Sequence, residues 1–260
     1  TLIGRLSFKD IDLIFYSNYI NFLQEEEYAS NSIGNDIKHL KVVMEKGLYF
    51  GLHKNISFRD KNFKKISILT FKIFLNEEEI KKIEGINLVD KDLRIARDYF
   101  LLAYYTGQRI SDVIDFSSEN IFMNNFLRFY VNKTGNEMQI PMHKKVREIF
   151  EIYGGLIPFM QPNKINKALK EIGKSAGLDQ IISFQEERGG KKIQVKKRKF
   201  ELITTHTARR SLITNLHLKG ISISNIMAIS GHKTESSLIR YIRSSASDRA
   251  EELKKLDFFN

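Results

Sequence analysis

The 260-residue sequence contains no cysteine, so the chain forms no disulfides and offers no thiolate ligands to a metal ion. It has no run approaching the roughly 18 apolar residues of a membrane span. No signal peptide is evident at its start. These absences argue against a secreted disulfide scaffold and against a membrane protein. We therefore expect a cytoplasmic protein with no membrane partner.

Two signatures of nucleotide and metal chemistry are also missing. The sequence has no G-x-x-x-x-G-K-[ST] loop, the motif that cradles the phosphates of a bound nucleotide. It has no tight cluster of carboxylates of the kind that holds Mg²⁺ for phosphoryl transfer. The sequence therefore predicts neither a cofactor nor a metal site.

Positive charge is what the sequence has in excess. The formal net charge is +11 and the isoelectric point is near 9.6. Lysine and arginine contacts to phosphates supply most non-specific affinity for nucleic acids, so this balance points to a polyanionic partner. A basic protein with no such role stays open on charge alone. Hydrophobic residues make up 42% of the chain, enough for the core of one large domain or two ordinary ones.

Two amphipathic helices are predicted near the start of the chain, over residues 10–28 and 31–48, because apolar residues recur there at helical spacing. Lys38 and Lys41 lie on the outer face of the second helix, where they are either solvated charges or contacts to a DNA backbone. Residues 54–70 lose the helical period and gain charge, which favours a linker between two domains.

The second domain is predicted to open at Asn76, where Asn-Glu-Glu-Glu resembles a capping box. A strongly apolar helix follows over residues 91–106. Thr106-Gly107 ends that helix and the helical pattern resumes at Ile110, so Arg109 lies at a helix N-terminus, which suits an anion. A lone arginine beside a turn is more commonly a surface charge. Two further amphipathic helices are expected over residues 143–153 and 162–176.

Two β-hairpins are predicted between these helices. Residues 126–142 alternate in hydropathy and turn at Thr134-Gly135-Asn136, with Lys133 at the end of the first strand. A second, strongly basic hairpin is expected around Gly189-Gly190, although a disordered basic loop stays open. Its cations are candidate contacts to DNA phosphates: Lys191, Lys192, Lys196, Lys197 and Arg198.

The segment from Thr205 to Tyr241 carries the side chains of a possible reaction. His206 and Arg209 are three residues apart at the start of a helical pattern, so both project from one face. Gly231 fits the end of a second short helix, which leaves His232 in a loop. A third helix is predicted to start near Thr234 and to carry Tyr241.

A tyrosine is a poor nucleophile at its usual pKa of about 10, but nearby cations favour the phenolate. Arg209 can offer its planar fork of donors to a phosphate, and His206 can donate or carry a proton near neutral pH. Simpler explanations stay open for single residues. His206 could be a core histidine, Tyr241 an ordinary amphipathic tyrosine, and Arg210 the phosphate ligand in place of Arg209.

This order of residues resembles the C-terminal signature of the tyrosine recombinases, the phage integrase family. The signature is H-x-x-R at His206 and Arg209, then Gly231-His232, then Tyr241 nine residues after that histidine. The family's T-G-x-R motif is matched by the residues ending at Arg109, and its hairpin lysine by Lys133. The match covers roughly residues 70–260, and the region before it resembles the family's core-binding domain. Departures are small: Gln108 stands where leucine is frequent, and Asp112 where glutamate is frequent.

The resemblance implies a mainly α fold with a small β-sheet and two domains. These are a helical core-type DNA-binding domain at residues 1–55 and a mixed α/β catalytic domain at residues 73–260, joined by a linker at residues 56–72. The segment after Tyr241 is then expected to be an exchange helix that docks on a neighbouring protomer in a cyclic homo-tetramer on DNA, while packing of this helix on its own domain stays open. Integrases of mobile elements often carry an upstream arm-binding domain, and because residue 1 is threonine an upstream segment stays open.

The resemblance also implies a role for each matched residue. Tyr241 is the nucleophile that forms a 3′-phosphotyrosyl link, and Arg109 and Arg209 flank the non-bridging oxygens. His206 helps to take the tyrosine proton or hydrogen-bonds the phosphate, His232 donates to a non-bridging oxygen, and Lys133 protonates the leaving 5′-oxygen. Asp112 is expected to brace Arg109 or a histidine without touching the phosphate.

The implied function is site-specific recombination of double-stranded DNA, for integration or excision of a mobile element such as a conjugative transposon. DNA-bending accessory proteins are possible further partners, and the expected location is the nucleoid in the cytoplasm. Two alternatives stay open. One is a non-catalytic helix-turn-helix regulator that uses residues 206–231, and the other is a type IB topoisomerase with the same covalent chemistry.

Overall fold

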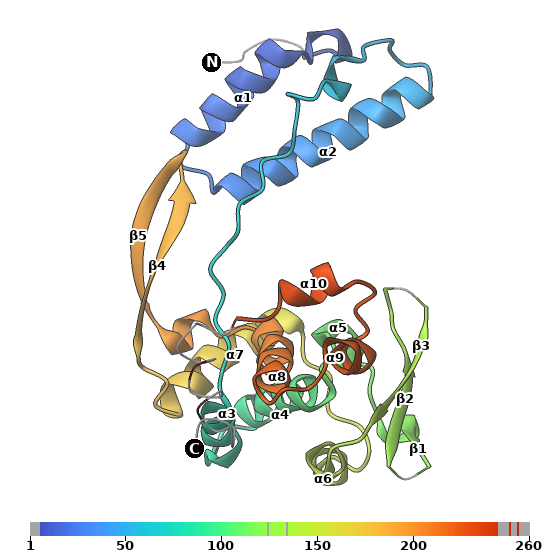
Figure 1. Ribbon diagram of the computed structural model, residues 1–260, viewed down its shortest axis with the longest axis vertical. Helices are drawn as coiled ribbons and strands as arrows, with labels where there is room; N and C mark the ends of the chain where they lie inside the picture. Colours follow the sequence, from blue (N-terminus) through green and yellow to red (C-terminus); the bar gives the residue numbers. More distant parts are fainter. Residues whose placement is uncertain (1–5, 124, 134, 244–249, 251–253, 255–260) are drawn as a thin grey trace. The chain divides into compact units, whose positions relative to one another are not determined.

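The computed structural model describes residues 6–123, 125–133, 135–243, 250 and 254. The chain divides into two compact units. The first contains the residues up to Phe71 together with Ser183–Lys196, and the second contains Lys72–Ile182 and the residues from Lys197 onward. The mainly helical fold with small sheets that the sequence predicts is confirmed (Figure 1).

The N-terminal unit is built on two helices, α1 (Leu13–Glu25) and α2 (Ser30–Tyr49). Asp12 begins α1 by accepting a hydrogen bond from the Phe15 amide at 2.8 Å. The inner face of α2 carries Ile37 and Met44, both fully buried, in agreement with the apolar spacing of the sequence. The predicted pair of helices is therefore confirmed, with α1 shorter than expected at both ends.

The linker expected over residues 56–72 begins later than the sequence indicates. Ser57–Arg59 forms a 3₁₀ helix, and the Phe58 and Phe63 rings are buried against α2. Two isolated aromatic residues in a charged stretch leave no periodic pattern, so composition alone assigns the stretch to a linker. The segment up to Phe63 therefore belongs to the core of the N-terminal unit.

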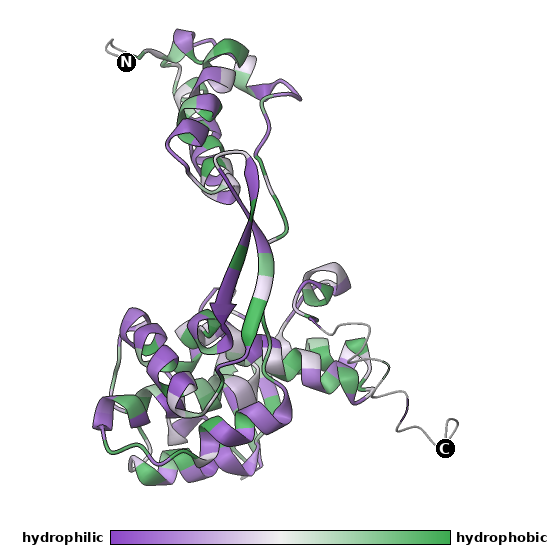
Figure 2. Ribbon diagram, turned by 90° about the vertical axis from the view of Figure 1, so that its left-hand side faces the viewer, coloured by the Kyte–Doolittle hydropathy of each residue, from purple (hydrophilic) through white to green (hydrophobic). Residues whose placement is uncertain are grey.

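The second predicted hairpin is formed by β4 (Ile181–Arg188) and β5 (Lys191–Arg198), so the disordered alternative is wrong. Its two-residue turn has positive φ at both glycines, +54° at Gly189 and +69° at Gly190, as a tight type I′ turn requires. Between them, β4 and β5 alternate hydrophilic stretches with short hydrophobic ones (Figure 2).

The outer part of this hairpin packs within the N-terminal unit. The Gly189 amide donates to the Tyr28 carbonyl at 3.2 Å, and the Ser30 hydroxyl donates to the Glu187 carboxylate at 2.6 Å. The Phe184 ring stacks on Phe71 at 4.7 Å between centroids. The sequence predicts contacts of this hairpin to DNA phosphates and carries no signal for this intramolecular docking.

The second unit contains eight α-helices among the described residues and a three-stranded antiparallel sheet of order β1-β2-β3. Its helices are α3 (Glu77–Gly85), α4 (Lys91–Thr106), α5 (Ile110–Val113), α6 (Lys144–Ile152), α7 (Pro162–Ser175), α8 (Thr205–Leu218), α9 (Ile223–Ser230) and α10 (Glu235–Ile239). Its strands are β1 (Ile121–Phe122), β2 (Phe126–Tyr130) and β3 (Glu137–Pro141).

Helix α8 contacts α4, α7 and α9 (Figure 1). Two of its polar side chains fix the segment that enters the unit. The Ser211 hydroxyl accepts the Leu75 amide at 2.8 Å, and the Asn215 side chain donates to the Leu75 carbonyl at 3.1 Å. The expected capping box at Asn76 is confirmed by reciprocal hydrogen bonds of 2.9 Å with Glu79.

Two sequence expectations need correction here. Strand β2 ends at Tyr130, so Lys133 lies in the loop between β2 and β3 and not at the end of a strand. Tyr241 lies just past the end of α10, which stops at Ile239, and not on the helix. The exchange helix expected after Tyr241 lies outside the described residues, apart from Ala250 and Lys254.

Gly34 in α2 packs against the segment that leads out of the N-terminal unit. A Cβ at this position would lie 1.8 Å from the Ile66 carbonyl oxygen, whereas a Cβ at Gly85 in α3 would meet no atom within 4 Å. We expect Gly34→Ala to destabilise the N-terminal unit by about 1–3 kcal/mol through overpacking. Gly85→Ala is the matched control and should be neutral or slightly stabilising. Thermal denaturation followed by circular dichroism tests this, and equal midpoints for the two variants would contradict the packing described.

Candidate active site

Arg209 is the centre of the site. It is 0% exposed, and its guanidinium donates from Nη1 to the Gly107 carbonyl at 2.7 Å and from Nη2 to the Ser230 carbonyl at 2.6 Å. Within the described residues its Nε has no hydrogen-bond partner. One side chain on α8 therefore joins the C-terminal ends of α4 and α9.

The two carbonyls are available because both helices end at a glycine in the left-handed conformation. Gly107 has φ +68° at the end of α4, and Gly231 has φ +67° at the end of α9. The last carbonyls of a helix have no partner inside the helix and carry its partial negative charge, so they suit a guanidinium. These are the glycines that the sequence predicted as helix stops.

His232 lies in the loop after α9, as expected, and contacts three groups. Its Nδ1 is 2.8 Å from the Ser230 hydroxyl, and its two ring nitrogens are 3.3 and 3.4 Å from Arg209 Nη2. Its ring packs edge-on against Tyr241 with centroids 4.8 Å apart. The Arg209 Cζ is 5.6 Å from the centre of the same tyrosine ring. The fold therefore brings Arg209, His232 and Tyr241 into mutual contact.

The main chain at Tyr241 is held by Thr214, a fully buried residue of α8. The Thr214 hydroxyl donates to the Tyr241 carbonyl at 3.3 Å and accepts the Arg243 amide at 3.2 Å. The half-buried Tyr241 ring also packs against the small apolar cluster of Ile213, Ile226 and Leu238. Thr214 carries no sequence signal of its own, because one buried threonine in an amphipathic helix is ordinary.

Arg109 precedes α5 and is half-buried. Its positive charge lowers the pKa of both Arg209 and His232, so it lies close enough to both to repel them. Because α5 has only four residues, its dipole adds little to the charge that Arg109 itself presents. The neighbouring Gln108 is buried, and its amide donates to the Ile229 carbonyl at 2.7 Å, which ties the Arg109 turn to the end of α9.

Asp112 contacts the loop that carries Lys133 rather than Arg109 or a histidine. Its buried Oδ1 accepts the Asn132 amide at 3.0 Å, and the Asn132 side chain donates to the Ser111 carbonyl at 2.8 Å. Lys133, the next residue, is exposed, and the structure gives its ammonium no partner among the described residues. The site thus fixes the base of the Lys133 loop and leaves the ammonium group free to reach outward.

The site's charges follow from burial and crowding. His206 at the start of α8 is exposed at its surface, yet the surrounding protein still desolvates its ring, and this, followed by repulsion from Arg210 and Arg209, lowers its pKa. Desolvation, followed by repulsion from Arg209 and Arg109, lowers the pKa of His232 to about 4. Desolvation, followed by repulsion from Arg109, lowers the pKa of Arg209 to about 10. At neutral pH the imidazoles are therefore uncharged and Arg209 remains a cation.

Arg210 turns away from this cluster. It is 8% exposed, and its Nη1 donates to the Ile73 carbonyl at 2.9 Å. Its neighbour Arg209 is the one that contacts His232 and Tyr241. Of the two arginines that the sequence left open, Arg209 is therefore the one that lies in the cluster, and Arg210 supports the segment before α3.

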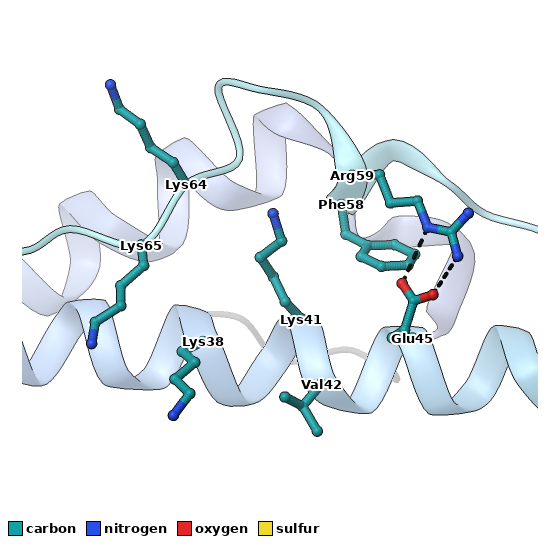
Figure 3. Close-up of a pocket in the computed structure, with 8 residues that line it drawn as sticks. All are labelled: Lys38, Lys41, Val42, Glu45, Phe58, Arg59, Lys64 and Lys65. Carbon is teal, nitrogen blue, oxygen red and sulfur yellow. Dashed lines mark hydrogen bonds and ion pairs between the residues drawn. The ribbon is translucent and has the colours of Figure 1, made fainter. Parts of the chain in front are cut away.

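A basic groove lies on the N-terminal unit between α2 and the 3₁₀ helix Ser57–Arg59 (Figure 3). Lys41 donates to the Phe63 carbonyl at 2.7 Å, so its ammonium is already engaged in the unit's own structure. Figure 3 shows Lys38 and Lys65 pointing to one side of the groove and Lys64 to the other. The cations are therefore spread along the face and do not converge on one anion.

The candidate cations of the β4–β5 hairpin lie at or near its surface. Four are exposed and Lys197 is half-buried; the exposed ones are Lys191, Lys192, Lys196 and Arg198.

Among the described residues, no group of three histidine or acidic side chains is arranged to hold a metal ion. No helix that the structure describes is long and apolar enough to cross a membrane.

Comparison with known proteins gives the following similarities. Residues 3–66 match the family model described as the phage integrase SAM-like domain. A tyrosine recombinase of Thermosipho africanus is 27% identical over 184 residues, which cover 70% of this chain and 61% of the relative. Tyrosine recombinase XerA of Pyrococcus furiosus is 26% identical over 200 residues, which cover 70% of this chain and 60% of the relative. The chain thus spans about three fifths of the length of these curated relatives.

Solved structures share the fold over nearly the whole chain. The Tn1549 transposon integrase in complex with circular intermediate DNA has a TM-score of 0.63 and 16% identity, covering 98% of this chain and 89% of that one. A lambda integrase dimer bound to a COC′ core site has a TM-score of 0.68 and 18% identity, covering 94% of this chain and 84% of that one. At these identities the likeness concerns the fold alone.

Thr214→Val keeps the side-chain volume of Thr214 but removes both hydrogen bonds to the Tyr241 segment. We expect that segment to open more readily, so that trypsin cleaves after Arg240 or Arg243 roughly fivefold faster under native conditions. Thr214→Ser retains the hydroxyl and is the matched control. Mass spectrometry of the released peptides measures both rates, and equal rates for Thr214→Val and the unaltered chain would remove the assigned role of Thr214.

Proposed function

We propose that this chain, a member of the tyrosine recombinase or phage integrase family, is a site-specific DNA recombinase. It would cleave and rejoin DNA through a covalent 3′-phosphotyrosyl intermediate, in the integration or excision of a mobile element. The observation that carries the proposal is the mutual contact of Arg209, His232 and Tyr241, with Arg109 close enough to act on the same charges. The likeness to the Tn1549 transposon integrase supports the mobile-element context.

The reaction is a transesterification in which the number of phosphodiester bonds is conserved. The Tyr241 Oη attacks phosphorus, the bond from phosphorus to the 5′-oxygen breaks, and a 3′-phosphotyrosine and a 5′-hydroxyl result. The phenol proton passes to His206, and the 5′-oxygen receives a proton from Lys133. Rejoining is the reverse attack by a 5′-hydroxyl on the phosphotyrosine. Because the bond energy is kept, the step draws on no nucleotide.

The charges of the site suit this reaction. Arg209 remains a cation at neutral pH, and together with the Arg109 guanidinium it would neutralise the non-bridging oxygens of the five-coordinate phosphorus. The lowered pKa of His206 leaves its imidazole neutral at pH 7, so it can accept the phenol proton. Asp112 is buried and accepts a hydrogen bond from the Asn132 amide in the loop before Lys133. Its carboxylate would therefore not contact the phosphate.

The remaining sequence expectations extend this proposal. Lys38, Lys41 and the exposed cations of the β4–β5 hairpin would contact the DNA backbone, with Lys41 held partly by its bond to Phe63. The N-terminal unit would be the core-binding domain and the second unit the catalytic domain. Recombination would proceed in a homo-tetramer on paired sites in the nucleoid of the cytoplasm, with DNA-bending accessory proteins as further partners.

Two rival functions differ in what they leave unexplained. A helix-turn-helix regulator built on α8 and α9 has no use for Tyr241 packed against His232 and Arg209. A type IB topoisomerase would use the same site but acts on a single duplex, whereas a recombinase needs two sites brought together. Relaxation of supercoiled DNA that contains no recombination site would favour the topoisomerase.

Tyr241→Phe should abolish covalent attachment to DNA while leaving binding intact, because only the phenol oxygen is lost. The probe is a pool of nicked duplexes of randomised sequence with 5′-bridging phosphorothioates, whose cleavage is not reversed. Adducts are counted on a denaturing gel, and binding by a mobility-shift assay. An adduct at the level of the unaltered chain would remove Tyr241 as the nucleophile, and no adduct with the unaltered chain would favour the regulator.

Lys133→Ala should slow cleavage of ordinary phosphodiester DNA by about 100-fold, the range expected for loss of a general acid. Cleavage of the 5′-bridging phosphorothioate should be restored, because the sulfur leaves without a proton. Lys144→Ala, at the start of α6, is the control for loss of one positive charge. Equal slowing on both substrates would show that Lys133 contributes binding or positioning and not the proton.

A further inference from the structure

The last residue of α9, Ser230, contacts the site through both its main chain and its side chain. Its carbonyl accepts from Arg209 Nη2 at 2.6 Å. Its hydroxyl is 2.6 Å from the Ile226 carbonyl and 2.8 Å from His232 Nδ1. The residue is 1% exposed, so protein groups alone must satisfy the hydroxyl.

Counting hydrogens decides the direction of these bonds. The Ser230 hydroxyl has one hydrogen, and a carbonyl oxygen can only accept, so the bond to Ile226 uses that hydrogen. The contact with His232 is then made only if Nδ1 carries a hydrogen and donates it to the hydroxyl oxygen. In a neutral imidazole Nε2 is then bare, and it can accept from Arg209 Nη2 at 3.4 Å.

The opposite tautomer satisfies fewer contacts. With the hydrogen on Nε2, the Ser230 hydroxyl must choose between Ile226 and His232, and one of its two short contacts is left without a hydrogen. Arg209 would then donate to Nδ1 at 3.3 Å in competition with the hydroxyl. Three hydrogen bonds form in the first arrangement, which leaves Nδ1 and Arg209 Nη2 as two donors 3.3 Å apart, and at most two form in the second. The first is favoured because a short buried polar contact without its hydrogen is costly.

We propose that Ser230 is a positioning residue that holds His232 in the tautomer with the hydrogen on Nδ1, so that Nε2 is an acceptor for Arg209 in the DNA-free protein. The groups that face the His232 ring are Arg209 from α8, Arg109 from the turn before α5, and Tyr241 from the segment after α10. The two cations oppose protonation of the ring and keep it neutral.

The consequence for catalysis rests on the proposed function. A bare Nε2 cannot donate a hydrogen bond to a non-bridging oxygen, which is the role that the resemblance implies for this histidine. In the resting site His232 instead orients Arg209, the cation that would meet the phosphate. A donor role requires His232 first to gain a proton at Nε2.

The tautomer can be read directly without DNA. In the full chain with ¹⁵N-labelled histidine, long-range proton–nitrogen correlations distinguish a ring protonated on Nδ1 from one protonated on Nε2. His232→Gln identifies the signals of this ring among the six histidines. We expect the Nδ1-protonated pattern in the unaltered chain at pH 7. A pattern with the hydrogen on Nε2 overturns the proposal.

Substitution then tests whether Ser230 causes the preference. Ser230→Ala should shift His232 toward the Nε2-protonated form, and Ser230→Thr, which keeps a hydroxyl, should restore the original pattern. Ser224→Ala makes the same change at an exposed position of α9 and should have no effect. An unchanged tautomer in Ser230→Ala overturns the proposal.

Cleavage of the nicked duplex pool supplies the catalytic readout. Ser230→Ala should lower the rate of adduct formation about 3- to 10-fold, as loss of one hydrogen bond implies, and Ser230→Thr should recover it. If the unaltered chain forms no adduct, the proposed function fails while the nuclear magnetic resonance result still decides the tautomer. If adducts form and Ser230→Ala cleaves at the full rate, the positioning role is overturned and the proposed function stands.

Discussion

A buried, permanently charged guanidinium is the constraint on which the second unit depends. Removing Arg209 from water is costly, and among the described residues no carboxylate is hydrogen-bonded to it, although the negative charge of Asp112 acts on it from a distance. The compensation comes from two backbone carbonyls that end α4 and α9, where helix dipoles concentrate negative potential. Both helices must therefore stop at the same place beside α8, and the two left-handed glycines are what allow them to stop there.

The other site residues are held by short polar ties to these same elements. Gln108 links the Arg109 turn to α9, Ser230 links α9 to His232, and Thr214 links α8 to the Tyr241 segment. Each tie uses a buried side chain and a backbone or ring group, so each fixes position without adding charge. Lys133 is the exception, because only the base of its loop is fixed, through Asn132.

What the sequence reveals depends on whether a feature repeats. Helices α2, α4, α6 and α7 follow from apolar periodicity, and their ends follow from glycine and from caps such as Asn76. The six residues proposed for the reaction follow from an ordered motif. Single contacts leave no such trace. The segment that carries Phe58 and Phe63 belongs to a core but has the composition of a linker. Asp112 accepts a hydrogen bond from an amide in the Lys133 loop and not from Arg109. Ser230 and Thr214 are small hydroxyl residues whose importance lies entirely in tertiary geometry.

The electrostatic state of the site is nearly independent of pH across the neutral range. Burial, with repulsion from Arg109 and Arg243 respectively, lowers the pKa of Arg209 and of Arg210 to about 10, which leaves both charged at pH 7. Burial, with repulsion from Arg209 and Arg109, lowers the pKa of His232 to about 4, which leaves it neutral. The repulsion between Arg109 and Arg209 is present in the protein without a ligand. An anion placed among these cations relieves it without any proton being exchanged. A phosphodiester carries one negative charge at every pH in this range, so it is the kind of ligand for which such a fixed set of cations is suited.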